Sequence, residues 1–170
     1  RLRTVTGVQT CALPICAILR EVLAAAELLE KDWKIGADVW SVTSFTELRR
    51  DGMSVERDNR FNPERDPKPS WVEHCLNGTT GPVIASTDYM RSVADLIRTW
   101  VPRRYVTLGT DGFGRSDTRA ALRDFFEVDR HHVVIATLKA LADEGSIDRK
   151  RVSEAISKYG VKTDRPNPWD

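Results

Sequence analysis

Several features that would point to a function class are scarce in this chain of 170 residues. Its 26 Lys and Arg residues nearly balance its 25 Asp and Glu residues, so the net charge of +1 gives no electrostatic basis for binding nucleic acid or an anionic membrane. No apolar run approaches the roughly 18 residues that a membrane-spanning helix needs. Three irregularly spaced cysteines predict no disulfide framework, which makes a reducing cytoplasm the expected compartment.

The motifs that mark common active sites are also missing. Neither G-x-x-x-x-G-K-[ST] nor G-x-G-x-x-G occurs, so the usual phosphate-binding loops are absent from the sequence. His131 and His132 are adjacent and diverge on a helix, as do His74 and Cys75, so neither pair can ligate one metal ion. No nucleophile, base and orienting group can be assembled. The sequence therefore predicts no catalytic, cofactor-binding or metal-binding residue in this chain.

The most informative stretch is YVTLGTDGFGRSD, residues 105–117, which has the pattern of a strand, a tight loop and a helix start. Three glycines flank Asp111 and Phe113, and glycine permits positive φ or close backbone approach. Asp111 is either an acid or base or, more simply, a side chain that stabilises the turn. Phe113 either returns to the core of the domain or packs against another domain or subunit. Because open α/β sheets bind at this edge, the loop is the first candidate site.

Segments with the helical and strand periods alternate along the chain. Strands are predicted at about 38–43, 82–87 and 104–108, with crossovers between them long enough for helices. Such crossovers predict a mixed, mostly parallel sheet covered on both faces, which is a three-layer α/β/α architecture. Helices are predicted at 17–31, 44–57 with a pause at Gly52, 70–76, 88–101, 117–126, 130–144 and 148–159.

Residues 5–15, VTGVQTCALPI, resemble the translation of a widely used sequencing adapter in all eleven positions. We therefore expect residues 1–16 to be non-native, residues 17–160 to form one domain, and residues 161–170 to be a loosely held tail. A native strand before Ala17 is expected to be lost, and residues 8–13 are expected to occupy its place in the sheet. The loss of that strand would expose a sheet edge, which favours aggregation.

Three segments together, residues 18–29, 41–52 and 85–129, resemble the C-terminal region of the homodimeric, bacterial pyruvate dehydrogenase family. The most specific parts are Asp88-Tyr89-Met90 and residues 109–119, GTDGFGRSDTR, and the likeness extends over residues 17–170. It implies a fold like the transketolase C-terminal domain. It also implies a parent enzyme that decarboxylates pyruvate oxidatively and passes the acetyl group to a lipoyl arm of dihydrolipoyl acetyltransferase.

In this family, thiamine diphosphate and magnesium are bound by upstream domains that this chain does not contain. The family's Gly-Asp-Gly motif with its later paired asparagines has no match here, and residues 109–112 contain only its Asp-Gly part. The resemblance thus implies an architectural domain that is inactive alone and that supports a neighbouring domain and a homodimer. The strand-end positions expected to make those contacts are Ser44, Phe45, Thr87, Asp88, Tyr89, Asp111, Phe113 and Arg115.

Two alternatives share the same fold. One is the C-terminal domain of another thiamine-dependent 2-oxoacid dehydrogenase or of a transketolase, because substrate choice is made in domains outside this chain. The other is a stand-alone, non-catalytic binding or regulatory module, since a fold does not determine a function. The reading frame upstream of Ala17 would distinguish them.

Overall fold

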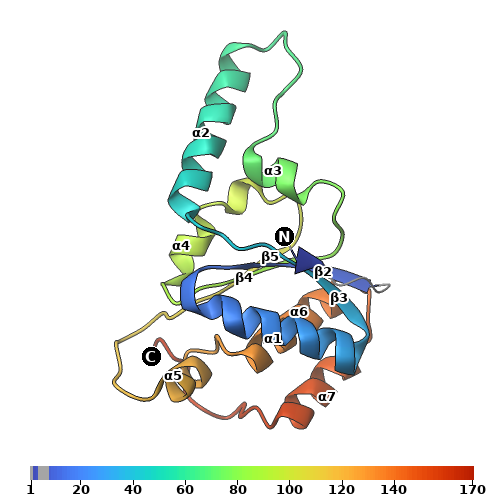
Figure 1. Ribbon diagram of the computed structural model, residues 1–170, viewed down its shortest axis with the longest axis vertical. Helices are drawn as coiled ribbons and strands as arrows, with labels where there is room; N and C mark the ends of the chain where they lie inside the picture. The colour runs from blue at the N-terminus through green and yellow to red at the C-terminus, as the bar shows by residue number, and fades with distance from the viewer. Residues whose placement is uncertain (1, 4–7) are drawn as a thin grey trace.

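The computed structural model describes residues 2–3 and 8–170, which form a mixed sheet between two layers of helices (Figure 1). The elements in chain order are β1 (Leu2–Arg3), β2 (Val8–Pro14), the 3-10 turn η1 (Cys16–Ile18), α1 (Leu19–Leu28), the π-helical turn η2 (Leu29–Trp33), β3 (Ile35–Val39), α2 (Phe45–Phe61), α3 (Trp71–Leu76), β4 (Val83–Ser86), α4 (Arg91–Asp95), the 3-10 turn η3 (Arg98–Trp100), β5 (Tyr105–Leu108), α5 (Arg119–Phe125), α6 (Arg130–Asp143) and α7 (Lys150–Tyr159). No helix within the described ranges is both long and apolar enough to cross a membrane.

The strand order is β1-β3-β2-β4-β5. β2 is parallel to β3 and to β4, β4 is parallel to β5, and only the short β1 is antiparallel to its neighbour β3. Figure 1 shows α1, α6 and α7 on one face of this sheet and α2, α3 and α4 on the other. The predicted three-layer α/β/α architecture with a mixed, mostly parallel sheet is therefore confirmed.

Residues 8–14 form the central strand β2. Cys11 is in register with Asp38 of β3 on one side and with Val83 of β4 on the other. Beyond the end of β3, the amides of Trp40 and Val42 still donate to carbonyls of β2, over 2.9 and 3.0 Å. The expectation that residues 8–13 occupy a strand position in the sheet is confirmed.

The strand predicted at 38–43 instead runs from Ile35 to Val39. The reason is local: Lys34 adopts the left-handed conformation, with φ 59°, and ends the preceding helical turn. The chain therefore enters the sheet earlier than its β-branched residues suggest, and Ile35 already pairs with Val8.

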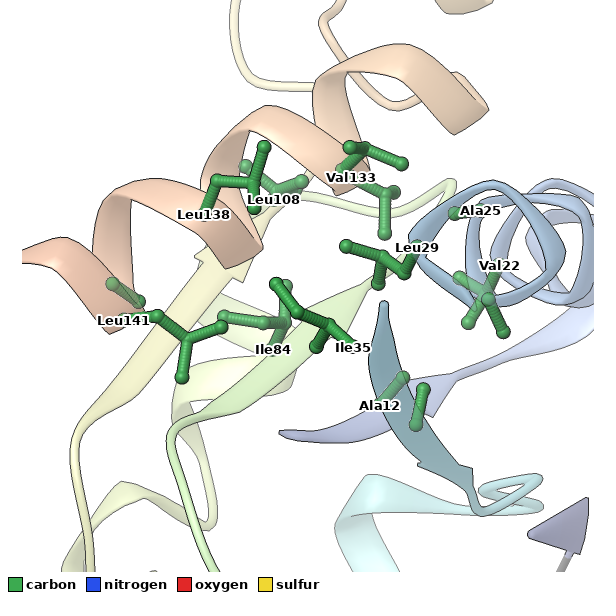
Figure 2. Packing of buried hydrophobic residues seen from close by; sticks show 14 of the residues in the cluster. Ala12, Val22, Ala25, Leu29, Ile35, Ile84, Leu108, Val133, Leu138 and Leu141 are labelled. Atoms are coloured by element: carbon green, nitrogen blue, oxygen red, sulfur yellow. The ribbon is translucent and has the colours of Figure 1, made fainter. Parts of the chain in front are cut away.

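The larger core lies between the sheet and the layer formed by α1, α6 and α7. Figure 2 shows Leu138 and Leu141 of α6 facing Ile84 and Ile35 of the sheet, with Leu29 beside them. All five side chains are buried, and full burial of one such side chain contributes about 1.5–3 kcal/mol. The helices predicted at 17–31 and 130–144 therefore cover this face of the sheet.

The second core lies under α2, α3 and α4 on the opposite face. Gly52 of α2 packs so closely on the indole of Trp100 that an added Cβ would overlap its ring atoms. The Trp100 Nε1 also donates to Glu56 Oε1 over 3.0 Å. Gly52 is thus a contact point rather than a pause, and α2 continues unbroken to Phe61, projecting from the body of the domain (Figure 1).

A charged cluster joins the start of α1 to the start of α6. Glu21 Oε1 lies 2.8 Å from Arg123 Nη1, and Glu21 Oε2 lies 2.9 Å from Arg130 Nε. Glu21 Oε2 also accepts from the Arg130 amide over 3.2 Å, which satisfies a free N–H group at the start of α6. The hydrogen bond from Arg130 and the two positive charges lower the pKa of Glu21 despite its burial.

Replacement of Glu21 by Gln is expected to lower the free energy of unfolding by about 2 kcal/mol at neutral pH, since it leaves two arginines without their carboxylate. The pKa of Glu21 is lower in the folded state, so its stabilisation is present above the ordinary value near 4.5 and is lost as the pH falls through the folded value. Urea unfolding between pH 7 and pH 3 should show a smaller loss on acidification for Glu21→Gln. The exposed Glu154→Gln is the control, and equal pH profiles for wild type and Glu21→Gln would contradict this role.

A variant that keeps only Cys11 (Cys16→Ser, Cys75→Ser) is expected to react with an aromatic disulfide reagent only when it unfolds. The Cys11 side chain is fully buried in β2, and burial raises the pKa of its thiol. Reaction rates across a urea series should follow the unfolded fraction. Rapid reaction without urea, as expected of a variant that keeps only the half-buried Cys75, would contradict the central position of β2.

Candidate functional site

Three segments meet at the edge of the sheet where the parallel strands end. Residues 87–91 follow β4, residues 109–117 follow β5, and residues 165–170 end the chain beside α5 (Figure 1). We call these three segments together the carboxyl-edge surface. They include six of the eight residues expected from the sequence to make interdomain or dimer contacts.

The first two segments are locked together through their backbones. The Thr110 amide donates to the Tyr89 carbonyl and the Thr110 hydroxyl donates to the Asp88 carbonyl, both over 2.9 Å. Gly109 lies so close to this segment that an added Cβ would be 2.7 Å from the Arg91 amide nitrogen and the Tyr89 carbonyl oxygen. A side chain at position 109 would therefore separate the two loops.

Asp111 stabilises this junction. Its two carboxylate oxygens lie 3.4 and 3.3 Å from the Arg91 amide nitrogen, and one of them lies 3.3 Å from Arg91 Nε. Of the two roles weighed from the sequence, the structure supports the turn-stabilising one. The carboxylate is already used by a cation and a backbone amide of its own domain.

The third segment, the tail, makes specific contacts instead of being loosely held as the sequence suggested. Gly112 has φ +108°, and an added Cβ would lie 2.9 Å from Trp169 Cα and closer still to the Pro168 carbonyl oxygen. Pro168 is buried, and the Arg91 guanidinium lies 4.9 Å from the centre of the Trp169 ring. The tail residues are polar and proline-rich in sequence, so only these tertiary contacts reveal the attachment.

Phe113 projects from this surface. Its side chain is 83% exposed, so the interpretation that it returns to the domain's own core is wrong. Tyr89, Met90 and Trp169 on the same three segments are also exposed, at 54, 57 and 45%. Large apolar side chains gathered in this way are typical of a contact surface.

A hollow of about 560 Å³ lies beneath the glycine loop. Asp88, Phe113 and Arg115 line it together with α5 and the residues that follow β2. The Arg115 guanidinium lies 4.0 Å from the centre of the Phe125 ring, which fixes this cation over an aromatic face. Asp88, Phe113 and Arg115 are thus brought together, as their strand-end positions predicted.

Besides Asp111, three of the expected contact residues serve the domain itself. Phe45 is 1% exposed in the second core, and Thr87 is fully buried, where its hydroxyl accepts from the Tyr89 amide over 3.0 Å. The expectation that Phe45 and Thr87 contact another domain or protomer is therefore wrong, because a strand-end position does not distinguish an inward from an outward side chain. Ser44 caps α2 by accepting from the Glu47 amide over 3.2 Å, and it lines a separate, largely apolar hollow of about 420 Å³ with Trp40 and Trp71.

The histidines are occupied by structural contacts. His131 stacks on Tyr159 with ring centres 4.8 Å apart, and His74 stacks on Trp71 at 5.4 Å. His132 Nδ1 lies 2.8 Å from Asp129 Oδ1. Burial raises the pKa of Asp129, but the hydrogen bonds from His132 outweigh it and leave that pKa below its ordinary value. The adjacent histidines diverge as expected.

One group of residues in the described part of the chain has the composition of a metal site. The ligand atoms of Asp124, Asp129 and His132 lie within 4.8 Å of one another. The guanidinium of Arg165 already binds two members of this group. Arg165 Nη1 donates to Asp124 Oδ2 over 2.8 Å, and Arg165 Nη2 lies 3.0 Å from His132 Nε2. The cluster therefore fits an internal latch better than a metal centre.

Met90, Arg91, Arg165 and Trp169 are the members of the surface that sequence reasoning missed. Met90 belongs to the Asp88-Tyr89-Met90 segment of the resemblance, so a signal was present for it. Arg165 and Trp169 lie in a short polar stretch at the end of the chain. The partners of Arg165 are more than 30 residues away in the sequence. No local pattern could have identified these two.

Comparisons with known proteins agree with this architecture. The transketolase-like TK C-terminal domain family matches residues 13–129. A solved structure described as a split gene transketolase, inactive beta4 tetramer, superposes with a TM-score of 0.54 and 21% identity, covering 83% of this chain and 42% of that one. At that identity the likeness supports the fold alone.

Curated relatives are much closer in sequence. The chain is 64% identical over 154 residues to the pyruvate dehydrogenase E1 component of Pseudomonas aeruginosa, 60% identical over 151 residues to that of Cupriavidus necator, and 50% identical over 153 residues to that of Escherichia coli K12. These matches cover 90, 89 and 89% of this chain but only 18, 17 and 17% of the relatives. The chain thus spans less than a fifth of their length, and it belongs to the transketolase-like TK C-terminal domain family.

Proposed function

We propose that this chain is the C-terminal domain of a pyruvate dehydrogenase E1 component and that its role there is architectural. The observation that carries the proposal is the identity of 64% to the Pseudomonas aeruginosa relative, over 90% of this chain. The exposed Phe113 and Tyr89 support an architectural role, because apolar side chains at a sheet edge are suited to contact a neighbouring domain or a second protomer.

The proposed parent enzyme is a homodimer in the cytoplasm. It decarboxylates pyruvate oxidatively and transfers the acetyl group to a lipoyl domain of dihydrolipoyl acetyltransferase. Its thiamine diphosphate and magnesium are assigned to domains outside this chain. The residues present here do not fit that cofactor. Asp111 lies in the only part of the family's Gly-Asp-Gly motif that this chain matches, and its carboxylate is already paired with Arg91.

The domain boundaries form part of the proposal. Residues 17–160 are assigned to the domain, residues 161–170 to its tail, and residues 1–16 to an adapter-derived segment. The length of the Pseudomonas aeruginosa match agrees with this division, because its 154 residues leave 16 of the 170 outside, whereas the family match begins at residue 13. If residues 1–16 are adapter-derived, β2 takes the place of the native strand, and its pairing with β3 on one side and β4 on the other holds it there.

The purified chain is expected to show no decarboxylation of pyruvate when thiamine diphosphate and magnesium are supplied, because no described residue is assigned to the chemistry. A chimera in which residues 17–170 replace the matching C-terminal region of the Pseudomonas aeruginosa relative is expected to be active, within about tenfold of that relative. Release of carbon dioxide and transfer to a lipoyl domain are the measurements. Decarboxylation by the chain alone would contradict the assignment of the active site to other domains.

In the same chimera, Phe113→Ala is expected to raise the dissociation constant of the dimer, or the rate at which protease releases the C-terminal domain, by about tenfold, which corresponds to roughly 1.4 kcal/mol. Phe61→Ala is the matched control, since Phe61 is 66% exposed at the far end of α2. Analytical ultracentrifugation and limited proteolysis provide the two measurements. Equal values for both variants and wild type would argue against a contact through the glycine loop.

A further inference from the structure

The tail from Arg165 to Asp170 is attached to the domain at two places. The first is the corner between α5 and α6, which Arg165 reaches. Its Nη1 donates to Asp124 Oδ2 over 2.8 Å and its Nη2 donates to the Asp124 carbonyl over 2.7 Å. Only 19% of the Arg165 side chain is exposed, and hydrogen bonds that involve a charged partner are stronger than neutral ones.

His132 completes this first attachment. Arg165 Nη2 lies 3.0 Å from His132 Nε2, and an arginine can only donate, so that nitrogen must be the acceptor. His132 Nδ1 then carries the proton and donates to Asp129 Oδ1 over 2.8 Å. The tail is thereby connected to the N-cap of α6, because the same Asp129 oxygen accepts from the amides of His131 and His132.

The second attachment is the glycine loop. Pro168 is buried and its carbonyl lies against Gly112, where the close approach and the φ of +108° both require glycine. Trp169 lies over the guanidinium of Arg91, which also pairs with Asp111 of the loop. Arg91 therefore connects all three segments of the carboxyl-edge surface.

The outer face of these segments is apolar. Seven large hydrophobic side chains of the described residues are exposed, and four of them lie here: Tyr89, Met90, Phe113 and Trp169. The other three, Met53, Phe61 and Trp71, lie on α2 and α3 across the sheet. A side chain exposed alone is ordinary, but four on interlocked segments make a contact surface.

We propose that residues 165–170 form a strap that holds the glycine loop and adds Trp169, which stacks on Arg91, to a surface that docks onto the preceding part of the parent polypeptide. This inference rests on the proposed function. We infer that the preceding polypeptide covers this surface because this chain accounts for only 15–18% of the length of the relatives. The rest of such a protein must contact the domain somewhere. The surface that holds four of the seven exposed large hydrophobic side chains of the described residues is the one best suited to that contact.

The two attachments of the strap each have their own variant. Arg165→Ala removes the contacts with Asp124 and His132 and keeps all four exposed apolar side chains. Trp169→Ala removes one of those side chains and keeps the Arg165 contacts. Both side chains lie outside the two cores, so the domain is expected to fold in each case. Arg165→Lys is a further test, because lysine keeps the charge but cannot reach Asp124 and His132 with two nitrogens of one planar group.

The experiment uses the active chimera with the Pseudomonas aeruginosa upstream region. Hydrogen exchange of the residues 109–113 amides is measured by mass spectrometry, and docking is measured by proteolytic release of the C-terminal domain. We expect Arg165→Ala to accelerate exchange in the loop at least tenfold, with Arg165→Lys intermediate and exchange within α6 unchanged beyond its first turn. We expect Trp169→Ala to accelerate release at least fivefold, whereas the exposed Trp71→Ala has no effect.

The outcomes separate this inference from the proposed function. If Phe113→Ala accelerates release but Trp169→Ala and Arg165→Ala change neither quantity, the strap is overturned and the architectural role stands. If none of the three variants changes release, both are overturned. If Trp169→Ala instead abolishes self-association of the 170-residue chain and leaves release from the chimera unchanged, the occupant is a second copy of the domain and the docking proposal is wrong.

Discussion

The pairing of β2 with strands on both sides is the constraint on which the rest of the structure depends. β2 supplies the backbone partners of β3 and β4, and its carbonyls also accept from the amides of Trp40 and Val42 beyond the end of β3. Without this strand the sheet would divide into two unconnected parts, each with an unpaired edge. Both cores depend on it as well, since Ala12 belongs to one and Cys11 and Leu13 to the other.

The parallel arrangement explains why the contact surface lies where it does. Parallel strands all end at one edge, so the segments that follow β4 and β5 must lie beside each other. Gly109 and Gly112 then allow close approach, the first to residues 89–91 and the second to the tail. The result is a surface whose backbone is fixed by its own domain and whose apolar side chains are available to another.

Much of this arrangement could be predicted from sequence because its signals are local. Hydrophobic periodicity located the long helices, and the helix predicted at 70–76 forms as α3, which begins with a capping box of Ser70 and Glu73. The strands predicted at about 82–87 and 104–108 form as β4 and β5, which end at Ser86 and Leu108. The grouping of Asp88, Phe113 and Arg115 followed from topology once the strands were assigned.

What the sequence did not reveal depends on contacts between distant residues. The helix predicted over 88–101 begins only at Arg91, because the carbonyls of Asp88 and Tyr89 accept from Thr110 of the loop. It also ends at Asp95 and is followed by the separate 3-10 turn η3. The burial of Phe45 and Thr87 and the attachment of the tail through Arg165 have the same kind of cause. Apolar periodicity does not encode which loop side chain a distant segment will cover.

The central claim is that the carboxyl-edge surface is buried in the complete parent protein. A structure of the chimera by electron cryomicroscopy tests it most directly, through the exposed fractions of Phe113 and Trp169, which are 83 and 45% in the domain alone. We expect both side chains to become buried against upstream residues of the same protomer or its partner. If both side chains remain exposed to solvent in the assembled enzyme, the carboxyl-edge surface is not a contact surface.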